Sequence, residues 1–507
     1  MHARSFPLGP IELKRLVWLS IAAFGLRLFY FTGLSLGDDV FYALQSIAHA
    51  RHLSWPPLPY HWQTRLGVTI PTSVSLAFFG LKPFAFVLWP LLASTATVTV
   101  AYLVAREFLS ERAAVLVAIF QTCFPLELIY ATHLFPDVLV GLFATLSIWF
   151  WIRGLRGGST RAYVCSGIFF AAGYLCRETV LMLGPIYVAL WILAGGFRRP
   201  EVLWACVVPA AVILCEAALY WATTGSPAYR WSAIAAQQHS ELNQHLVETS
   251  TAGGSFWLDP LLMLLFNQEF GLYQITALLV ALYTLVRVPA LRVVALWWLV
   301  GFLWSYYGTT VPDRYVPLQR DPRYAAPLTV PALVLIASVV DRMRKWSRFG
   351  VASCLVITGI AAAGLDQGSS VLTAHKRLLQ SVKGPEIGLE PFEYFGARWQ
   401  LGLNTTPVFS CLDDAGRGSV VQALSALDDI KRVHLSESRY IVFSPDRRPD
   451  LLASLLANRW RVTEQFDMKP GVLRQYAGRA LALIPSQAKR AERVLHPPGL
   501  LLLENPR

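Results

Sequence analysis

Residues 115–150 read VLVAIFQTCFPLELIYATHLFPDVLVGLFATLSIWF. Two long apolar runs follow each other here across a short polar loop, and the stretch contains no lysine or arginine. Because about 20 mostly apolar residues cross the hydrocarbon core of a bilayer, each run is suited to span a membrane. The stretch predicts two membrane-spanning helices, near 113–131 and 136–153, with Asp137 at the start of the second.

The composition of the whole chain agrees with this interpretation. Of 507 residues, 55% are hydrophobic and only 15% are charged, whereas a soluble domain carries about 25% charged residues. We therefore exclude a disordered chain, a secreted disulfide scaffold and an ordinary cytosolic enzyme, and predict a polytopic α-helical membrane protein. The net charge of +12 comes from short basic clusters between apolar runs, which argues against nucleic acid as a partner.

Eleven apolar stretches are candidates for membrane-spanning helices. They lie near 16–35, 84–104, 113–131, 136–153, 162–176, 179–196, 201–223, 271–286, 293–308, 324–340 and 349–365. The first follows a basic cluster, as a signal peptide does, but it is long and lacks a small-residue cleavage motif. We expect it to be an uncleaved anchor.

The orientation depends on residues 66–80, LGVTIPTSVSLAFFG, which are short and contain Pro71. If they do not span, thirteen basic residues lie in cytoplasmic loops and five in the later external loops, as the positive-inside rule requires. The thirteen are Arg106, Arg112, Arg153, Arg156, Arg161, Arg198, Arg199, Arg287, Arg292, Arg342, Arg344, Lys345 and Arg348; the five are Arg177, Arg230, Arg314, Arg320 and Arg323. We therefore predict an interfacial or re-entrant helix at 66–80 and a cytoplasmic N-terminus. The external loops are then 36–83, 132–136, 177–178, 224–270 and 309–323.

Residues 366–507 follow the last predicted span and form an external tail. DLLASLLANRW and VVQALSALDDI are typical of helices, while RYIVFS, RVTEQF and ALALI are typical of strands. We predict a transmembrane domain at 1–365, with its first external loop at 36–83, and a small external α/β domain at 366–507.

Three acids stand at predicted external helix starts. Asp38 and Asp39 precede an apolar pattern at helical spacing, and such a pair can supply a general base, bind a metal or a substrate hydroxyl, or simply cap the helix. Asp137 complements a helix dipole in the same way. It is also a charge close to hydrocarbon, where charges are costly and tend to be functional. Both interpretations stay open for each acid.

Arginines gather on the same predicted side. Arg177 either binds a lipid phosphate through its planar donors or pairs with its neighbour Glu178. The external loop at 309–323 contains Arg314, Arg320 and Arg323 against the positive-inside bias, which indicates an anionic substrate or interfacial anchoring. Arg27, inside the first span, is free to snorkel or to pair with the acids of the first loop.

Metal-ligand patterns are not evident. The seven cysteines form no CxxC pair, and His49, His52, His61 and His133 match no ligand spacing, so structural roles are expected for the histidines. No metal site is assigned and no cofactor is certain, although the acid pair leaves a divalent metal open.

The order of these motifs resembles the GT-C class of membrane glycosyltransferases. Within it, residues 1–365 resemble the bacterial relatives of the protein O-mannosyltransferases and the aminoarabinose transferase, of the glycosyltransferase family 39 type. The resemblance is carried by LGDDVFY, WPPLPYHWQTRLGVTIPTSVSLAFFG, residues 115–150 and DPRYAAPLTVPALVL, with GYLCRET as a looser match. The acid-Lys-Pro element of the aminoarabinose transferases is absent, and Gln63-Thr64-Arg65 stands in its neighbourhood.

The resemblance implies an enzyme of glycan biosynthesis in the cell inner (plasma) membrane. It would transfer a hexose or pentose from a polyprenyl-phosphate donor to a glycan, lipid or protein acceptor on the outer face. Asp38 or Asp39 would be the base and Asp137 the second acid, while Arg177, Arg323 and Arg320 would contact the carrier phosphate. We expect an inverting displacement. The alternatives are a polyprenyl-lipid or glycolipid flippase, which would place polar sites near the membrane midplane, and a non-catalytic scaffold.

Overall fold

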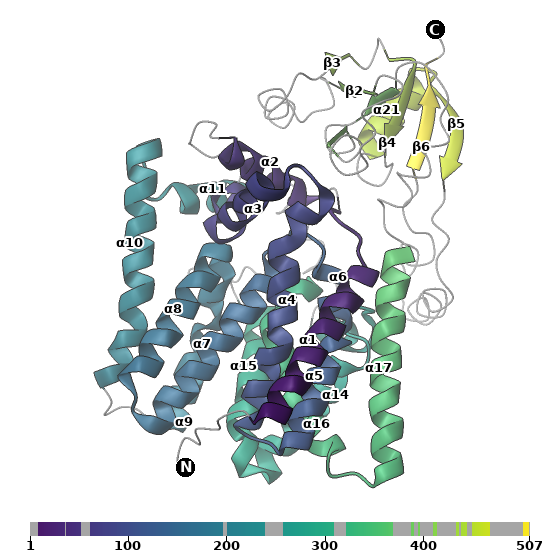
Figure 1. Cartoon of the computed structure of the whole chain (residues 1–507). Helices are drawn as coiled ribbons and strands as arrows, with labels where there is room; N and C mark the ends of the chain where they lie inside the picture. The colour runs from purple at the N-terminus through teal and green to yellow at the C-terminus, as the bar shows by residue number, and fades with distance from the viewer. Residues whose placement is uncertain are drawn as a thin grey trace. The chain divides into compact units, whose positions relative to one another are not determined.

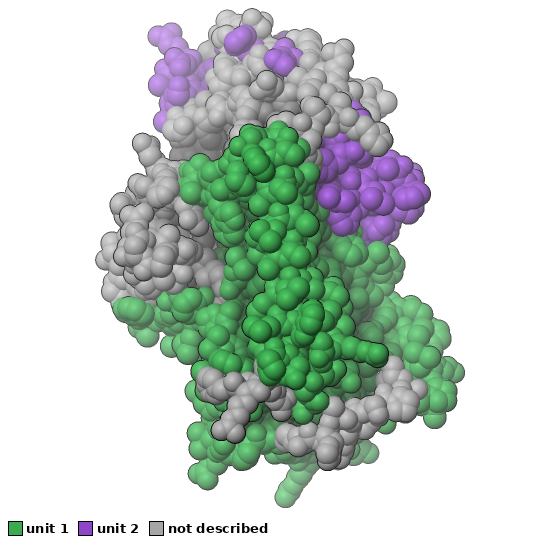
Figure 2. Space-filling model, turned by 90° about the vertical axis from the view of Figure 1, so that its left-hand side faces the viewer, with its two compact units in different colours: residues 1–31, 64–68, 89–364 green, residues 32–63, 69–88, 365–507 purple. Residues whose placement is uncertain are grey.

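The computed structural model describes residues 9–35, 37–51, 61–195, 200–238, 257–308 and 321–368. In the tail it describes 387–389, 394–395, 409–412, 432–434, 438–443, 449–466 and 500–505. The chain forms two compact units (Figure 2). Unit 1 contains residues 1–31, 64–68 and 89–364, and unit 2 contains 32–63, 69–88 and 365–507.

Six helical segments of the described residues are long and apolar enough to cross a membrane, judged by length and composition. They are α4 (Pro83–Arg106), α7 (Asp137–Gly157), α10 (Trp204–Thr224) with the turn before it, α15 (Arg292–Tyr307) with η5 (Pro289–Leu291), η6 (Pro322–Leu328) with α16 (Thr329–Val340), and α17 (Lys345–Gly368) up to Gly364. Each coincides with a predicted span. The predicted number of about eleven is not confirmed.

The other predicted spans correspond to shorter or more polar helices. These are α1 (Pro10–Phe29), α5 (Glu111–Thr122), α8 (Thr160–Cys176), η2 (Glu178–Leu183) with α9 (Gly184–Leu193), and α14 (Tyr273–Arg287). The prediction of one continuous helix at 113–131 is wrong, because α6 (Pro125–Tyr130) is separate. Pro125 has no backbone N–H to donate and holds Phe124 in an extended conformation, with ψ 122°, so the preceding helix ends at Thr122.

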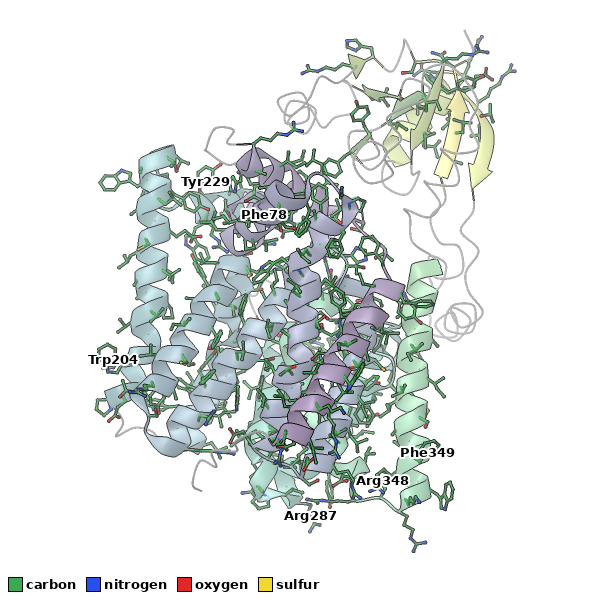
Figure 3. All side chains as sticks on the ribbon, in the orientation of Figure 1. Phe78, Trp204, Tyr229, Arg287, Arg348 and Phe349 are labelled. Atoms are coloured by element: carbon green, nitrogen blue, oxygen red, sulfur yellow. The ribbon has the colours of Figure 1, made fainter. Side chains whose placement is uncertain are left out.

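Unit 1 has the inverted polarity of a membrane protein. Leu214 and Trp221 of α10 are 69% and 68% exposed, whereas Glu216 of the same helix is buried. Figure 3 shows Trp204 on the outer side of α10. An apolar exterior with charges turned inward is the arrangement that a lipid environment favours.

Ion pairs tie together the ends of unit 1 that were predicted to be cytoplasmic. Arg106 pairs with Glu12 at 3.1 Å, and Arg112 pairs with Asp341 at 2.6 Å. Arg153, near the end of α7, lies 3.5 Å from Glu107. The start of α1, the α4–α5 loop and the ends of α7 and α16 therefore lie close together, and Figure 3 shows Arg287 and Arg348 at the end of unit 1 opposite Tyr229.

Arg27 neither snorkels nor reaches the acids of the first loop. It is fully buried in α1, where its Nε donates to Ser94 Oγ at 2.6 Å and its Nη1 donates to the Ala23 carbonyl at 3.1 Å. Ser94 in turn donates to Glu127 of α6 at 2.6 Å. A buried charge in a bundle must be compensated by a partner of opposite charge, and this chain through Ser94 connects Arg27 with Glu127.

Unit 2 contains α2 (Asp38–Ala50), most of α3 (Leu66–Phe79) and the tail. Both helices fall where the sequence predicted helices. The 14 residues of α3 extend about 21 Å, which is less than the hydrocarbon core of a bilayer. The predicted interfacial or re-entrant position of α3 stays a prediction.

The tail contains a six-stranded sheet, formed by β1 (Ile387–Leu389), β2 (Phe409–Leu412), β3 (Arg432–Val433), β4 (Tyr440–Phe443), β5 (Arg461–Phe466) and β6 (Leu500–Glu504) (Figure 1). Its order is β3-β2-β1-β4-β6-β5, with the first four strands parallel and β6 antiparallel to both of its neighbours. Ile441, Leu455 of α21 (Pro449–Ala457), Trp460 and Leu503 pack in one core. The patterns VVQALSALDDI and ALALI lie outside the described residues.

Candidate active site

Asp137 and Arg177, far apart in the sequence, form a buried ion pair. Asp137 is the first residue of α7, and Arg177 is an extended residue (φ −164°, ψ 133°) between α8 and η2. The Arg177 Nη1 donates to Asp137 Oδ1, and the two side chains are only 10% and 3% exposed. An acid at the N-terminus of α7 is favourable for the helix by itself. The buried ion pair with Arg177 goes beyond this capping role.

The segment η6, which leads into α16, completes this cluster. The Nη2 of Arg177 donates to the hydroxyl of Tyr324 at 2.8 Å, and the guanidinium lies 4.4 Å from the centre of the Tyr324 ring. The neighbouring Arg323 pairs with Asp321 at 2.6 Å and lies over the ring of Phe135 at 4.4 Å. The segment that carries the predicted second acid, Asp137, and the segment DPRYAAPLTVPALVL therefore meet at one place.

Asp137, Arg323 and Tyr324 line a cavity of about 30 Å³. Its other walls come from Val140, Thr179, Leu183, Ser305 and Pro327. The second carboxylate oxygen of Asp137, Oδ2, is buried and has no hydrogen-bond partner in the described part of the chain. Such a cavity has room for about two water molecules, so a polar atom of a water or ligand can reach the free oxygen of Asp137.

The charge of the cluster is balanced between two arginines and two acids. Burial favours the protonated form of Asp321, but Arg323 and its hydrogen bonds hold the pKa of Asp321 below its ordinary value. Asp321 therefore neutralises Arg323, while Asp137 is the ion-pair partner of Arg177. An anion that entered here would compete with these carboxylates for arginine donors.

Asp38 and Asp39 differ sharply in their surroundings. Asp39 is fully buried in the first turn of α2, and its carboxylate accepts from the backbone N–H of Gly37 at 2.8 Å and from that of Ser35. Burial is the main cause that raises the pKa of Asp39 to about 6, against the effect of these donors. Asp38 is partly exposed, and no hydrogen bond or ion pair of its side chain is found among the described residues.

Of the two interpretations of Arg177, the pair with its neighbour Glu178 is not the one that the structure shows, since Arg177 pairs with Asp137. Glu178 accepts from Arg65 at 2.7 and 3.2 Å and from Arg230 at 3.2 Å. Burial works against ionisation, but the two arginines keep the pKa of Glu178 well below its ordinary value. The sequence reasoning missed that Arg65, Arg230 and Glu216 belong to one cluster with Glu178, in which Glu216 is a partner of Arg230. The available signal was Glu216 itself, an acid in the middle of the apolar stretch 201–223, whose other acid, Glu201, stands at its first position.

Three further predictions concern Arg320, a metal site and the histidines. Arg320 lies outside the described residues. Among the residues that the structure describes, no three His, Cys, Asp or Glu side chains gather in a way that could hold a metal ion. His133 is buried beside Phe135, and burial followed by the charge of Arg323 lowers the pKa of His133 to about 4, so the ring is neutral at pH 7.

Comparison with known proteins identifies the fold. Residues 69–221, which include Asp137 and Arg177, match the family model described as dolichyl-phosphate-mannose-protein mannosyltransferase. No curated protein is significantly similar in sequence.

Solved structures resemble the chain over most of its length. The apo structure of ArnT from Cupriavidus metallidurans is 15% identical with a TM-score of 0.56, covering 89% of this chain and 96% of that one. The structure of the same protein bound to undecaprenyl phosphate is 13% identical with a TM-score of 0.52, and it covers the same shares of the two chains. An oligosaccharyltransferase of Archaeoglobus fulgidus tethered to an acceptor peptide is 12% identical with a TM-score of 0.50, covering 90% of this chain and 72% of that one. The chain therefore has the fold of the GT-C membrane glycosyltransferases, as its sequence motifs predicted.

Proposed function

We propose that the protein is a glycosyltransferase that moves a sugar from a polyprenyl-phosphate-linked donor to an acceptor at the outer face of the inner membrane. The observation that carries this proposal is the buried Asp137–Arg177 pair beside a cavity, inside the segment that matches the mannosyltransferase family model. A structure with the same fold holds undecaprenyl phosphate. That structure supports a lipid phosphate as the ligand of this site.

Arg177 and Arg323 are assigned to the carrier phosphate, with Arg320 as a further contact. A sugar–phosphate bond that breaks leaves negative charge on the phosphate, and fixed cationic donors in a site of low polarity stabilise that charge. The arginines are held by Asp137 and Asp321 before the donor binds. Asp137, with one oxygen free, is assigned to the sugar or to an acceptor hydroxyl.

Asp38 is assigned as the general base and Asp39 as the residue that shapes its turn. Both carboxylate oxygens of Asp39 accept from the preceding backbone, while Asp38 is more exposed and has no such bond to any residue that the structure describes. In a single displacement, the acceptor hydroxyl gives its proton to the base as its oxygen attacks the anomeric carbon. The bond from that carbon to the phosphate oxygen breaks, and the carrier phosphate leaves. The anomeric configuration of the product is then opposite to that of the donor.

The test is the release of undecaprenyl phosphate from radiolabelled undecaprenyl-phosphate sugars by the purified protein in lipid nanodiscs. A panel of hexose and pentose donors is supplied with water or extracted envelope glycans as acceptor. We expect Asp38→Asn to lower the rate by about 10²- to 10⁴-fold, the contribution of a general base, and Asp137→Asn to abolish most of the activity. Asp341→Asn, which removes an acid at the other end of unit 1, is the matched control and retains the rate.

Each outcome decides between functions. Wild-type release by Asp38→Asn and Asp137→Asn alike would refute the catalytic assignment. Movement of an unreacted donor across vesicle membranes, without release of carrier phosphate, would favour the flippase. A product with the anomeric configuration of the donor would contradict the single displacement.

A further inference from the structure

Unit 1 contains a second, larger cluster of buried charges that the proposed reaction does not use directly. Arg230 donates to Glu216 Oε1 at 2.8 Å, to Glu178 Oε2 at 3.2 Å and to the Tyr174 carbonyl at 2.9 Å. Arg65 donates to both carboxylate oxygens of Glu178. The side chains of these four charged residues are between 1% and 14% exposed, so the cluster is almost fully removed from solvent.

The cluster connects four segments that are distant in the sequence. Arg65 immediately precedes α3, Glu178 begins η2, Glu216 lies in α10, and Arg230 lies in α11 (Tyr229–Gln238). Tyr174 of α8 closes the cluster, since its hydroxyl donates to Glu216 Oε2 at 2.7 Å and its ring lies 4.5 Å from the Arg230 guanidinium. The two arginines and two glutamates balance in charge, which is the condition under which buried charges are tolerated.

This cluster bears on the candidate active site through the chain itself. Arg177 is extended, so the side chains of Arg177 and Glu178 leave the backbone in different directions. Arg177 reaches Asp137 and Tyr324, and Glu178 reaches Arg65 and Arg230. A turn of the chain that is held on both sides in this way has little freedom to shift the guanidinium of Arg177.

We propose that Glu178, held by Arg65 and Arg230, is a positioning residue that fixes Arg177 for the carrier phosphate. This inference rests on the proposed function. Arg177 has only a short backbone connection between α8 and η2, and neither helix alone determines where its side chain points. The cluster supplies the missing constraint at the adjacent residue. A catalytic group that is displaced by about 1 Å lowers the reaction rate by up to about 10²-fold.

Glu178→Gln and Glu216→Gln make a matched pair for the test. Each removes one negative charge from the same buried cluster, and each leaves Arg230 with one carboxylate partner. Only Glu178 adjoins Arg177. We expect Glu178→Gln to lower kcat for sugar transfer by up to about 10²-fold and to raise the donor KM, and Glu216→Gln to leave both within about twofold of the wild type. Equal losses in both variants would mean a purely structural cluster and would overturn the proposal.

A second measurement does not need the enzyme to be active. Unfolding of the wild type, Asp137→Asn, Glu178→Gln and the double variant in detergent gives a double-mutant cycle, and a parallel cycle replaces Glu178→Gln by Glu216→Gln. We expect non-additivity of at least about fivefold in the unfolding equilibrium constant for Asp137 with Glu178, and additivity for Asp137 with Glu216. Additivity in both cycles would refute positioning through Arg177. If the wild type transferred no sugar but the Asp137 and Glu178 substitutions were non-additive, the proposed function would fail. The positioning of Arg177 by Glu178 would still be supported.

Discussion

Asp39 is the most deeply buried of the three candidate acids, and its surroundings determine how stability depends on pH. Its pKa rises from 3.8 to about 6, mainly because burial penalises the charged carboxylate. The folded protein therefore holds a proton that the unfolded chain has already released between about pH 4 and pH 6. The resulting stabilisation is complete below the unfolded pKa and is lost as the pH rises through about 6.

This argument predicts that stability falls with rising pH for Asp39, and that this contribution is absent for its amide. The rise in pKa corresponds to about 3 kcal/mol of unfolding free energy. We expect the wild type to lose up to that amount relative to Asp39→Asn between pH 4 and pH 8, because asparagine does not titrate. Unfolding in detergent micelles at both pH values measures the difference. Parallel pH profiles for the two proteins would contradict the burial of an ionisable Asp39.

Some charged residues of these clusters could be identified from the sequence, and others could not. Asp137, Arg177 and Arg323 could be found because each is a charge at the edge of an apolar stretch, and the structure brings all three to one place. Arg65 could not be assigned a partner in this way. Its partner, Glu178, is 113 residues away, so only the packed helices reveal the pair. Sequence neighbours such as Arg177 and Glu178 were a misleading guide because an extended backbone directs them apart.

At the scale of elements, the start of α3 at Gly67, which belongs to unit 1, lies close against the backbone at the end of α8. A Cβ atom at Gly67 would lie 2.7 Å from the Cys176 nitrogen and 2.8 Å from the Leu175 carbonyl carbon. Backbone atoms cannot rotate aside as a flexible side chain does. Gly67 is therefore required for this contact, which also holds Arg65 near Glu178.

Replacement of Gly67 should force these two elements apart. We expect Gly67→Ala to destabilise the protein by about 1–3 kcal/mol, the usual cost of overpacking, and to weaken the Arg65–Glu178 pair. Gly25→Ala in α1 is the control, because its Cβ would meet no atom within 4 Å. Thermal unfolding of both variants tests the expectation. Equal midpoints would show that α3 and α8 separate without cost.

The boundaries of elements were predicted less well than their existence. Hydropathy located all six long apolar helices, because lipid requires long apolar runs with every backbone group bonded internally. It failed at Pro125, where 113–131 appeared continuous, since apolar composition does not register a missing backbone N–H. The strand order of the β-sheet in the tail could not be predicted from the sequence either. Its strand order joins residues up to 64 positions apart, such as Tyr440 and Glu504, and alternation within one strand carries no information about its neighbour.

At the scale of the whole molecule, the Asp137–Arg177 pair and the Arg153–Glu107 pair lie at opposite ends of α7 in unit 1. Helix α7 begins at Asp137 in the candidate site and ends at Gly157, four residues after Arg153, which pairs with Glu107. Its 21 residues extend about 31 Å, close to the thickness of the hydrocarbon core. The candidate site and the loop that carries Glu107 therefore lie at opposite ends of a helix whose length is close to the thickness of the hydrocarbon core.

The orientation of this axis is the prediction on which an external site depends. Thirteen basic residues against five assign the Arg153 end to the cytoplasm. We expect green fluorescent protein to fluoresce, and alkaline phosphatase to be inactive, when fused after Gly158 or Met343, and the reverse when either is fused after Arg507. Truncated fusions are checked by repeating each as an in-frame insertion in the full chain. An active phosphatase after Gly158 would mean that the orientation of the protein in the membrane is the reverse of the predicted one. The carrier phosphate would then have to meet Arg177 from the cytoplasm, which would exclude transfer at the outer face whatever the fate of the catalytic variants.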